Sequence, residues 1–448
     1  MKDFELLRSL GSELSSKTKD MKHKFDEKWI ENLISFYEVN KGKKLIHISD
    51  IQDDLFIKLT AEGKDLLRSR PFSKTDINSI KSIKLFLKSN GTFVSLKNLK
   101  KFLGENIDII EPYIEQIKTT KAGIGRSVKN PKFPINLDTE FGAILIGNYP
   151  DTAIKTGQFV SKDKEILIEL EKSFNEQIGE IKANIWHRSV YHMQISSIVK
   201  ILYKLSGINV KDRQIVTNNG VPYWTFSSSE NFQKLLLKKL WDAEGSAPNN
   251  KKMCLGQSVV LRKISEDVPF YPERKYFSNC ENKKGILENP PNLIVSIQLL
   301  LYKFGIVSYS KPHRLYKRKN GMIVCDWHLI IIRYPNIKKF YDEVGFGLKR
   351  KQMMLEECLN SYSRNYPREK IEREEEILKI AKNFKKFTIL DLEGKVQLSR
   401  GTLRNYLTLL SKKRKIEKIR TIPQINTTSY LNEYRVGDVS NEKSFRAG

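Results

Sequence analysis

The sequence predicts an α+β fold that is divided into several domains. Between residues 136 and 360, short helices with a 3.6-residue apolar period alternate with strand-like runs, whereas the flanking segments read mainly as helices. At roughly 150 residues per domain, the 448 residues allow about three domains. Apolar residues make up 40% of the chain, which suffices for hydrophobic cores and excludes a wholly disordered protein.

The chain carries a large positive charge, because 79 Lys and Arg stand against 52 Asp and Glu, a formal net charge of +27. Double-stranded DNA is the expected partner, since neutralising phosphates releases counterions and rewards many basic side chains. No apolar run approaches the roughly 20 residues that span a bilayer, so we expect no membrane partner. The first residues, MKDFELLRSL, lack the features of a signal peptide, and we expect a cytoplasmic protein.

Two regions precede the α+β core. Residues 1–70 read as a helical region in which we find no chemistry. Residues 71–135 read as three short helices, the third over 106–117, followed by a linker rich in Gly, Pro and Lys. This pattern predicts a helix-turn-helix-like unit, with a plain three-helix bundle as the alternative.

The central region, residues 136–362, contains the same pattern of elements twice. One helix ends in GNYP and is followed by strands and helices, and a second helix ends in DAEGS and is followed by a similar series. The two repeats are expected at about 138–230 and 231–362. Four cysteines lack CxxC spacing, and six histidines show no pairing typical of a metal ligand set, so we assign no zinc site.

Residues 363–448 predict a winged helix-turn-helix, because three short helices precede a basic run and a returning strand. The third helix, near 399–411, would be the recognition helix and would present Arg400 and Arg404. An ordinary solvated charged face is the alternative. The basic run would add phosphate contacts through Lys412, Lys413, Arg414 and Lys415.

Three motifs in order then indicate a family. They are LKKLWDAEG at 237–245, the helix containing LLLYKFGI, and the turn GFGLKRK. Together these resemble the LAGLIDADG homing endonucleases of the dodecapeptide (DOD) type. The resemblance implies a pseudo-twofold, duplicated core of αββαββα repeats with saddle-shaped sheets along the DNA major groove. It also implies two central motif helices, each ending in an acid that binds Mg²⁺ at a scissile phosphate.

In the second motif the resemblance makes Glu244 the catalytic acid and metal ligand, and Gly245 the residue at which the chain leaves the helix in a left-handed turn. The first motif, Phe141–Tyr149, is degenerate, because Asn148 stands where the acid belongs. Asp151 could replace it if Pro150 turns the chain back.

Other site residues follow from the same resemblance. Gly142 and Gly147 would allow the two motif helices to pack closely, although Lys238 and Lys239 stand opposite. Gly147 could also offer a backbone oxygen to the metal, and Lys311 is our choice for the basic residue near the active site. The hairpin after it would contact DNA, unless it is an ordinary basic loop, through Arg314, Lys317, Arg318 and Lys319.

The resulting prediction is a monomeric, site-specific DNA endonuclease that depends on Mg²⁺ and is slow or nicking because of Asn148. The first alternative is a DNA-binding transcriptional regulator with a decayed, inactive core. The second is an intron RNA maturase. We expect a freestanding protein rather than an intein, since the chain begins with Met1, ends in FRAG and contains no His-Asn dipeptide.

Overall fold

The chain forms two compact units, an N-terminal unit over Met1–Cys358 and a C-terminal unit over Leu359–Gly448. We had expected this division between residues 362 and 363. The computed structural model describes residues 4–21, 23–52, 55–70, 77–89, 93–119, 127–153, 157–181, 183–196, 198–210, 218–248, 252–261, 289–317, 323–363, 370–393, 395–396, 398, 400–423 and 430–437. Within these ranges no helix is both long and apolar enough to cross a membrane.

The first two helices cover an apolar helix of the core. Helices α1 (Glu5–Thr18) and α2 (Lys28–Val39) pack on α11 (Asn292–Lys303). Every residue of α11 from Asn292 to Leu301 is buried, as expected for a helix that is apolar on all sides. The hydroxyl of Tyr37 in α2 donates a hydrogen bond of 2.7 Å to the backbone oxygen of Val221. The start of the chain therefore completes the core.

A small sheet follows, with strand order β3-β2-β4-β5. Because β2 (Phe56–Leu59) pairs with β3 (Val94–Ser95) and β4 (Ile114–Lys118), the boundary expected at residue 70 cuts through this sheet and is wrong. The remaining elements are β1 (Leu45–Ile46), η2 (Ile48–Asp50), α3 (Ala61–Arg68), α4 (Ile77–Lys88), α5 (Leu96–Leu103), η3 (Gly104–Tyr113), β5 (Val128–Lys129) and β6 (Ile135–Asn136), the last paired with β1.

The third helix that we expected over 106–117 does not form as such. The chain forms a 3₁₀ helix that contains Pro112, and residues 114–118 form strand β4. Proline removes a backbone donor and so disfavours an α-helix through this point. Before it, α5 begins as expected, because the Ser95 hydroxyl accepts a hydrogen bond from the backbone N–H of Asn98.

The first half of the core begins with the motif helix α6. Its outer layer is an antiparallel sheet of order β7-β8-β10-β9. The elements in chain order are α6 (Glu140–Gly147), η4 (Tyr149–Asp151), β7 (Thr152–Ala153), β8 (Gln158–Ser161), α7 (Lys164–Gln177), β9 (Asn184–His187), β10 (Tyr191–Gln194) and α8 (Ile198–Ser206).

The second half begins with the motif helix α10 and contains an antiparallel sheet of order β11-β13-β12. Its strands are longer than those of the first half, and β13 packs on the buried helix α11. The elements are η5 (Tyr223–Ser227), α10 (Glu230–Ala243), β11 (Lys252–Leu261), α11, β12 (Tyr309–Lys317), β13 (Ile323–Ile332), α12 (Tyr334–Glu343) and α13 (Lys349–Ser363).

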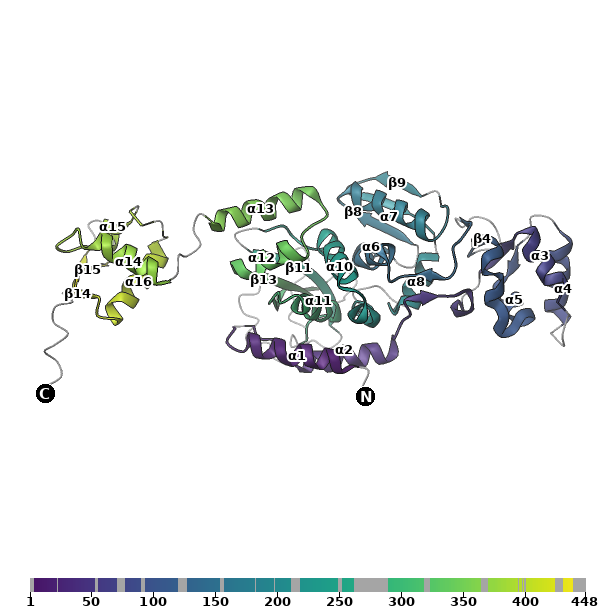
Figure 1. Ribbon diagram of the computed structural model, residues 1–448, viewed down its shortest axis with the longest axis horizontal. Coiled ribbons are helices and arrows are strands. Elements are labelled where there is room, and N and C mark those ends of the chain that lie inside the picture. The colour runs from purple at the N-terminus through teal and green to yellow at the C-terminus, as the bar shows by residue number, and fades with distance from the viewer. Residues whose placement is uncertain are drawn as a thin grey trace. The chain divides into compact units, whose positions relative to one another are not determined.

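The two halves share an order of elements. In each, among the described residues, a first helix precedes strand structure (β7 and β8, or β11), a second helix and a two-stranded hairpin; α8 then ends the first half, and α12 and α13 end the second. The second strand of the hairpin is central in both sheets, since β10 lies between β8 and β9, and β13 lies between β11 and β12. Helices α6 and α10 pack against each other where the halves meet (Figure 1).

The C-terminal unit contains three helices and a two-stranded antiparallel sheet. Its core is formed mainly by apolar residues of all three helices, together with Ile416 and Tyr434 from the two strands. The elements are α14 (Lys370–Ala381), α15 (Ile389–Leu392), α16 (Arg400–Lys412), β14 (Ile416–Pro423) and β15 (Tyr430–Val436). This order is the one that the sequence predicted for the region.

Candidate active site

Helices α6 and α10 approach closely at Gly147. A Cβ at Gly147 would lie 2.4 Å from the Cβ of Lys239 and 3.3 Å from the backbone nitrogen of Leu240. Lys239 nevertheless fits, because its buried side chain extends to an ion pair with Glu169 of α7. Gly142 has a different role from the one expected, since a Cβ there would meet the backbone oxygen of Leu137.

Replacing Gly147 with alanine is expected to destabilise the N-terminal unit by about 1–3 kcal/mol, because the added methyl group overlaps α10 and its backbone cannot yield easily. Thermal unfolding of the full chain measures the change. The matched control is Gly401→Ala in α16, where nothing lies within 4 Å of the new Cβ and helix propensity favours alanine. Equal stability changes for the two variants would contradict the close packing.

Asp151 and Glu244 meet where α6 and α10 end. The chain leaves α6 through η4, in which Pro150 occupies the first turn, and this turn brings the Asp151 carboxyl into contact with that of Glu244. Burial, and after it the charge of Asp151, raise the pKa of Glu244 to about 8. Burial raises the pKa of Asp151 to about 6. Near neutral pH the pair therefore holds a proton between its two carboxyls.

Asn148 does not join this pair. Its side-chain amide donates a 2.8 Å hydrogen bond to the backbone oxygen of Ile144, one turn back in its own helix. The next residue, Tyr149, is also buried, and its hydroxyl donates to the backbone oxygen of Asn219. The position that the motif assigns to an acid is thus occupied by an amide that closes the end of α6.

Lys351 of α13 holds the end of α10. Its buried ammonium donates hydrogen bonds to the backbone oxygens of Trp241 at 3.0 Å, of Asp242 at 2.6 Å and of Gly245 at 2.6 Å. The Trp241 oxygen also accepts a hydrogen bond from the Gly245 N–H, whereas a helix leaves carbonyl groups such as that of Asp242 unpaired at its C-terminus. Glu244 lies between the held residues, so Lys351 fixes the backbone that carries the acid.

Asp242 of α10 in turn holds the start of α13. Its carboxylate accepts hydrogen bonds from the backbone N–H groups of Gly347 and Leu348, immediately before α13. A Cβ at Gly347 would lie 2.6 Å from an oxygen of that carboxylate, which explains the second glycine of GFGLKRK. The two helix ends therefore cap each other, with the Asp242 carboxylate at one and the Lys351 ammonium at the other.

Gly245 follows Glu244 for a reason different from the one we expected. Its φ is not in the left-handed region, and the residue forms an antiparallel bridge with Leu255 of β11. A Cβ at Gly245 would lie 2.5 Å from the Trp241 ring and 2.6 Å from the Trp241 backbone oxygen. Glycine is required here by lack of space, and the predicted left-handed turn is wrong.

Asp151 and Glu244 line a cavity of about 630 Å³, with residues 160–163 on one side and 243–247 on the other. Lys162 is exposed at this cavity, and Arg350 beside it forms an ion pair of 2.7 Å with Asp163. Lys311 does not line it and instead pairs with His328 in the second sheet. The sequence analysis missed Lys162 and Lys351, although GFGLKRK contained the second of them.

The residues at the cavity fit a divalent cation. Two half-buried carboxyls in contact are unfavourable when both are ionised, and a proton or a cation relieves this repulsion. Carboxylate oxygens are ligands that Mg²⁺ prefers, and Asp151 and Glu244 would supply one each. Gly147 packs against α10 and does not line the cavity, so the structure gives no support to its backbone as a metal ligand.

The predicted DNA-contacting hairpin is only partly described. Arg314 lies in β12 and forms an ion pair of 3.2 Å with Asp326 of β13. The backbone of Lys317 ends β12. Arg318 and Lys319 lie outside the described residues.

The predicted basic residues of the C-terminal unit divide into two groups. Arg404 is exposed on α16, and Arg400 lies 3.7 Å from Glu393 in an exposed ion pair. Lys412, Arg414 and Lys415 are also exposed, where α16 meets β14. Lys413 differs, because its ammonium contacts both carboxylate oxygens of the buried Glu374 at 2.7 and 2.8 Å. Lys413 therefore has a structural contact, and its contact with DNA stays a prediction.

Lys413→Ala is expected to destabilise the C-terminal unit by about 1–3 kcal/mol, because the Glu374 carboxylate is left buried without its cation. Arg404→Ala serves as the matched variant, since this exposed side chain can be shortened without disturbing the core. It should leave unfolding unchanged and weaken duplex binding. A Lys413→Ala protein of normal stability that binds DNA poorly would support the predicted DNA contact instead.

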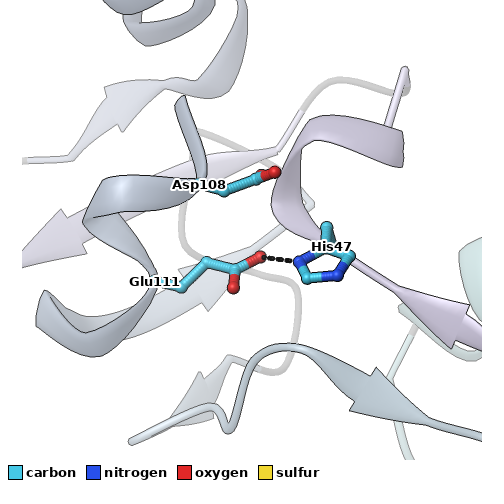
Figure 2. Close-up of side chains that lie close together, drawn as sticks. All are labelled: His47, Asp108 and Glu111. Atoms are coloured by element: carbon cyan, nitrogen blue, oxygen red, sulfur yellow. Dashed lines mark ion pairs between the residues drawn. The ribbon is translucent and has the colours of Figure 1, made fainter. Parts of the chain in front are cut away.

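A second cluster of ionisable side chains lies near the start of η2. His47 Nδ1 lies 3.3 Å from a Glu111 oxygen, and Asp108 is close to both residues (Figure 2). Both carboxylates accept hydrogen bonds from the start of η2, Glu111 from the N–H of Ile48 and Asp108 from that of Ser49. This capping accounts for the two acids. No sequence pattern predicted a partner for His47, because His47 is distant along the chain from Asp108 and Glu111.

Comparison with known proteins identifies the class of the second half. Residues 231–345 match the model of a family described as a LAGLIDADG-like domain, and this part of the chain is therefore similar to that family. This confirms the resemblance drawn from the motifs.

No curated protein matches the chain. Among solved structures, the crystal structure of full-length DUF199/WhiA from Thermatoga maritima is similar over 62% of this chain and 92% of that chain. The two are 11% identical with a TM-score of 0.29, a likeness too low to support any argument.

Proposed function

We propose that the protein binds double-stranded DNA site-specifically and hydrolyses a phosphodiester bond with Mg²⁺ held by Asp151 and Glu244. The observation that carries this proposal is the contact of two half-buried carboxyls, one from each half, at a cavity between the ends of the paired helices. The LAGLIDADG-like domain and the net charge of +27 support DNA as the substrate. We further propose that the shared element order reflects a duplicated, pseudo-twofold core in a monomer.

The side chains around the cavity have separable roles in this proposal. A bound Mg²⁺ would supply Lewis acidity that polarises a phosphoryl oxygen. Asp151 and Glu244 hold the negative charge that attracts the cation, and Lys351 keeps the backbone around Glu244 fixed. Lys162, which is exposed at the cavity, would bind a phosphate of the DNA strand that is cut. The exposed basic residues of α16 would lengthen the bound site if the C-terminal unit is a winged helix-turn-helix.

The test is a cleavage assay on a plasmid that carries the genomic DNA flanking the gene. With Mg²⁺, the wild-type protein should produce nicked or linear plasmid, and Glu244→Gln and Asp151→Asn should each reduce the rate about 100-fold or more. Both variants should still bind the DNA. Asn148→Ala is the control and should cut within a few fold of the wild type, since this amide faces its own helix. An absence of product, or cleavage by Glu244→Gln, would refute the endonuclease proposal.

The buried amide of Asn148 favours a second candidate, a DNA-binding regulator that does not cut. One half of the motif has lost its acid, and the replacement comes from a residue three positions later. This candidate predicts tight, sequence-selective binding that is independent of Mg²⁺, with no strand cleavage. The same assay separates it from the first proposal. Competition with structured RNA tests the maturase alternative.

A further inference from the structure

The sheet of the first half carries a row of three amides. In β8 and β10, Phe159 and Met193 are buried on one face, and residues on the other face are half-exposed. On that outer face Gln194 of β10 pairs with Gln158 of β8 on one side and with Asn184 of β9 on the other. Cross-strand partners lie on the same face, so the three amides stand side by side on neighbouring strands. We call Gln158, Gln194 and Asn184 the amide row.

The next position along the same face is aromatic. His192 pairs with Trp186, and their rings stack with centroids 5.5 Å apart. The amide nitrogen of Gln158 lies 3.0 Å from Nδ1 of His192, which ties the row to this stack. Among the residues described on the outer face of β8, β10 and β9, polar groups are amides, an imidazole and an indole, and none is a Lys, Arg, Asp or Glu.

The sheet of the second half presents a different chemistry. Lys252 of β11 and Lys311 and Arg314 of β12 pair with outer-face residues of β13. They surround His328, whose pKa falls to about 4 because of burial and then the neighbouring charges. The imidazoles of His313 and His328 stack 3.9 Å apart at the centre of the group. We call Lys252, Lys311 and Arg314 the cationic face, in which Asp326 pairs with Arg314.

We propose that the two sheets bind the two halves of one duplex by different means: the amide row reads base edges, with adenine preferred, and the cationic face binds phosphates. This inference rests on the proposed DNA-binding function and adds that the target is chemically asymmetric. Side-chain amides offer a donor and an acceptor together, which matches N6 and N7 of adenine in the major groove. Lysines give affinity that falls with salt and carries little sequence information.

The experiment uses the full chain in EDTA, so that binding is measured without cleavage. Preferred sites are selected from random duplexes, and the Kd for the best site is then measured over a range of salt concentrations. Asn184→Ala changes the exposed end of the amide row, and the double variant Lys252→Ala, Lys311→Ala removes two cations. Thermal unfolding checks that each variant is folded.

Asn184→Ala should raise the Kd for the selected site about 10-fold and lose base preference at positions within one half-site, with the salt dependence unchanged. The double variant should keep the base preferences and lower the slope of log Kd against log salt by roughly 1.8, or about 0.9 per phosphate. The proposed division between base reading and phosphate binding would be overturned by either of two results. One is a selected site whose two halves show equally strong base preferences, and the other is an Asn184→Ala protein with intact base preference. Failure of the wild type to select any duplex would instead refute the proposed function.

Discussion

Lys351→Met should lower the free energy of unfolding of the N-terminal unit by about 3 kcal/mol. The substitution keeps the length of the side chain but removes the ammonium donor from the backbone oxygens of Asp242 and Gly245, and from that of Trp241, which keeps its hydrogen bond from the Gly245 N–H. It also removes the positive charge of Lys351, which lowers the pKa of both Asp151 and Glu244. Without this charge, the protonated forms of the two carboxyls are favoured. Denaturant unfolding of the full chain, followed by a probe in the N-terminal unit, measures the change.

Lys349→Met is the matched control. Lys349 lies two residues earlier in the same helix and is exposed, so its replacement should change stability by less than about 0.5 kcal/mol. Lys351→Arg tests geometry, because a planar guanidinium cannot direct its donors as a compact ammonium does toward three converging oxygens. If Lys351→Met and Lys349→Met proteins unfold alike, Lys351 does not hold the end of α10.

Local signals in the sequence predicted the parts of the site that are close together along the chain. The motif LKKLWDAEG, through its resemblance to the LAGLIDADG family, indicated Glu244, and Pro150 suggested how Asp151 could take the place of Asn148. The structure brings these two acids together. The cap that Ser95 provides is a local contact of the same kind, because its partner Asn98 is only three residues away.

Local sequence patterns did not reveal the parts of the site that depend on residues distant along the chain. Lys351 and Asp242 cap each other's helices across more than one hundred residues, and no local pattern pairs them. Strand β2 joins a sheet with β4, which is over fifty residues later, so a boundary drawn at residue 70 from helical patterns cuts through this sheet. Glycine is required at position 245 because the Trp241 ring leaves no space for a Cβ. The position of this ring is known only from the packing of α10 in the folded chain.

The second prediction with a large effect concerns pH. In the absence of divalent cations, stability of the N-terminal unit should fall by a few kcal/mol as pH rises from about 4 to about 8. The folded pKa values of Asp151 and Glu244, about 6 and about 8, lie above the ordinary values of 3.8 and 4.5. Between these limits the folded chain binds more protons than the unfolded chain, so each step up in pH favours unfolding, and the loss ends above pH 8.

Mg²⁺ should reverse this loss at pH 7–8, because a cation that binds the folded carboxylates stabilises them in place of the proton. Binding at pH 7 should then release protons, which calorimetry in buffers of different ionisation enthalpy measures. The double variant Asp151→Asn, Glu244→Gln removes both titrating groups and should abolish both the excess pH dependence and the effect of Mg²⁺. Identical pH profiles for this variant and the wild type would show that the two acids ionise as they do in water, and a shared cation site would then lose its physical basis.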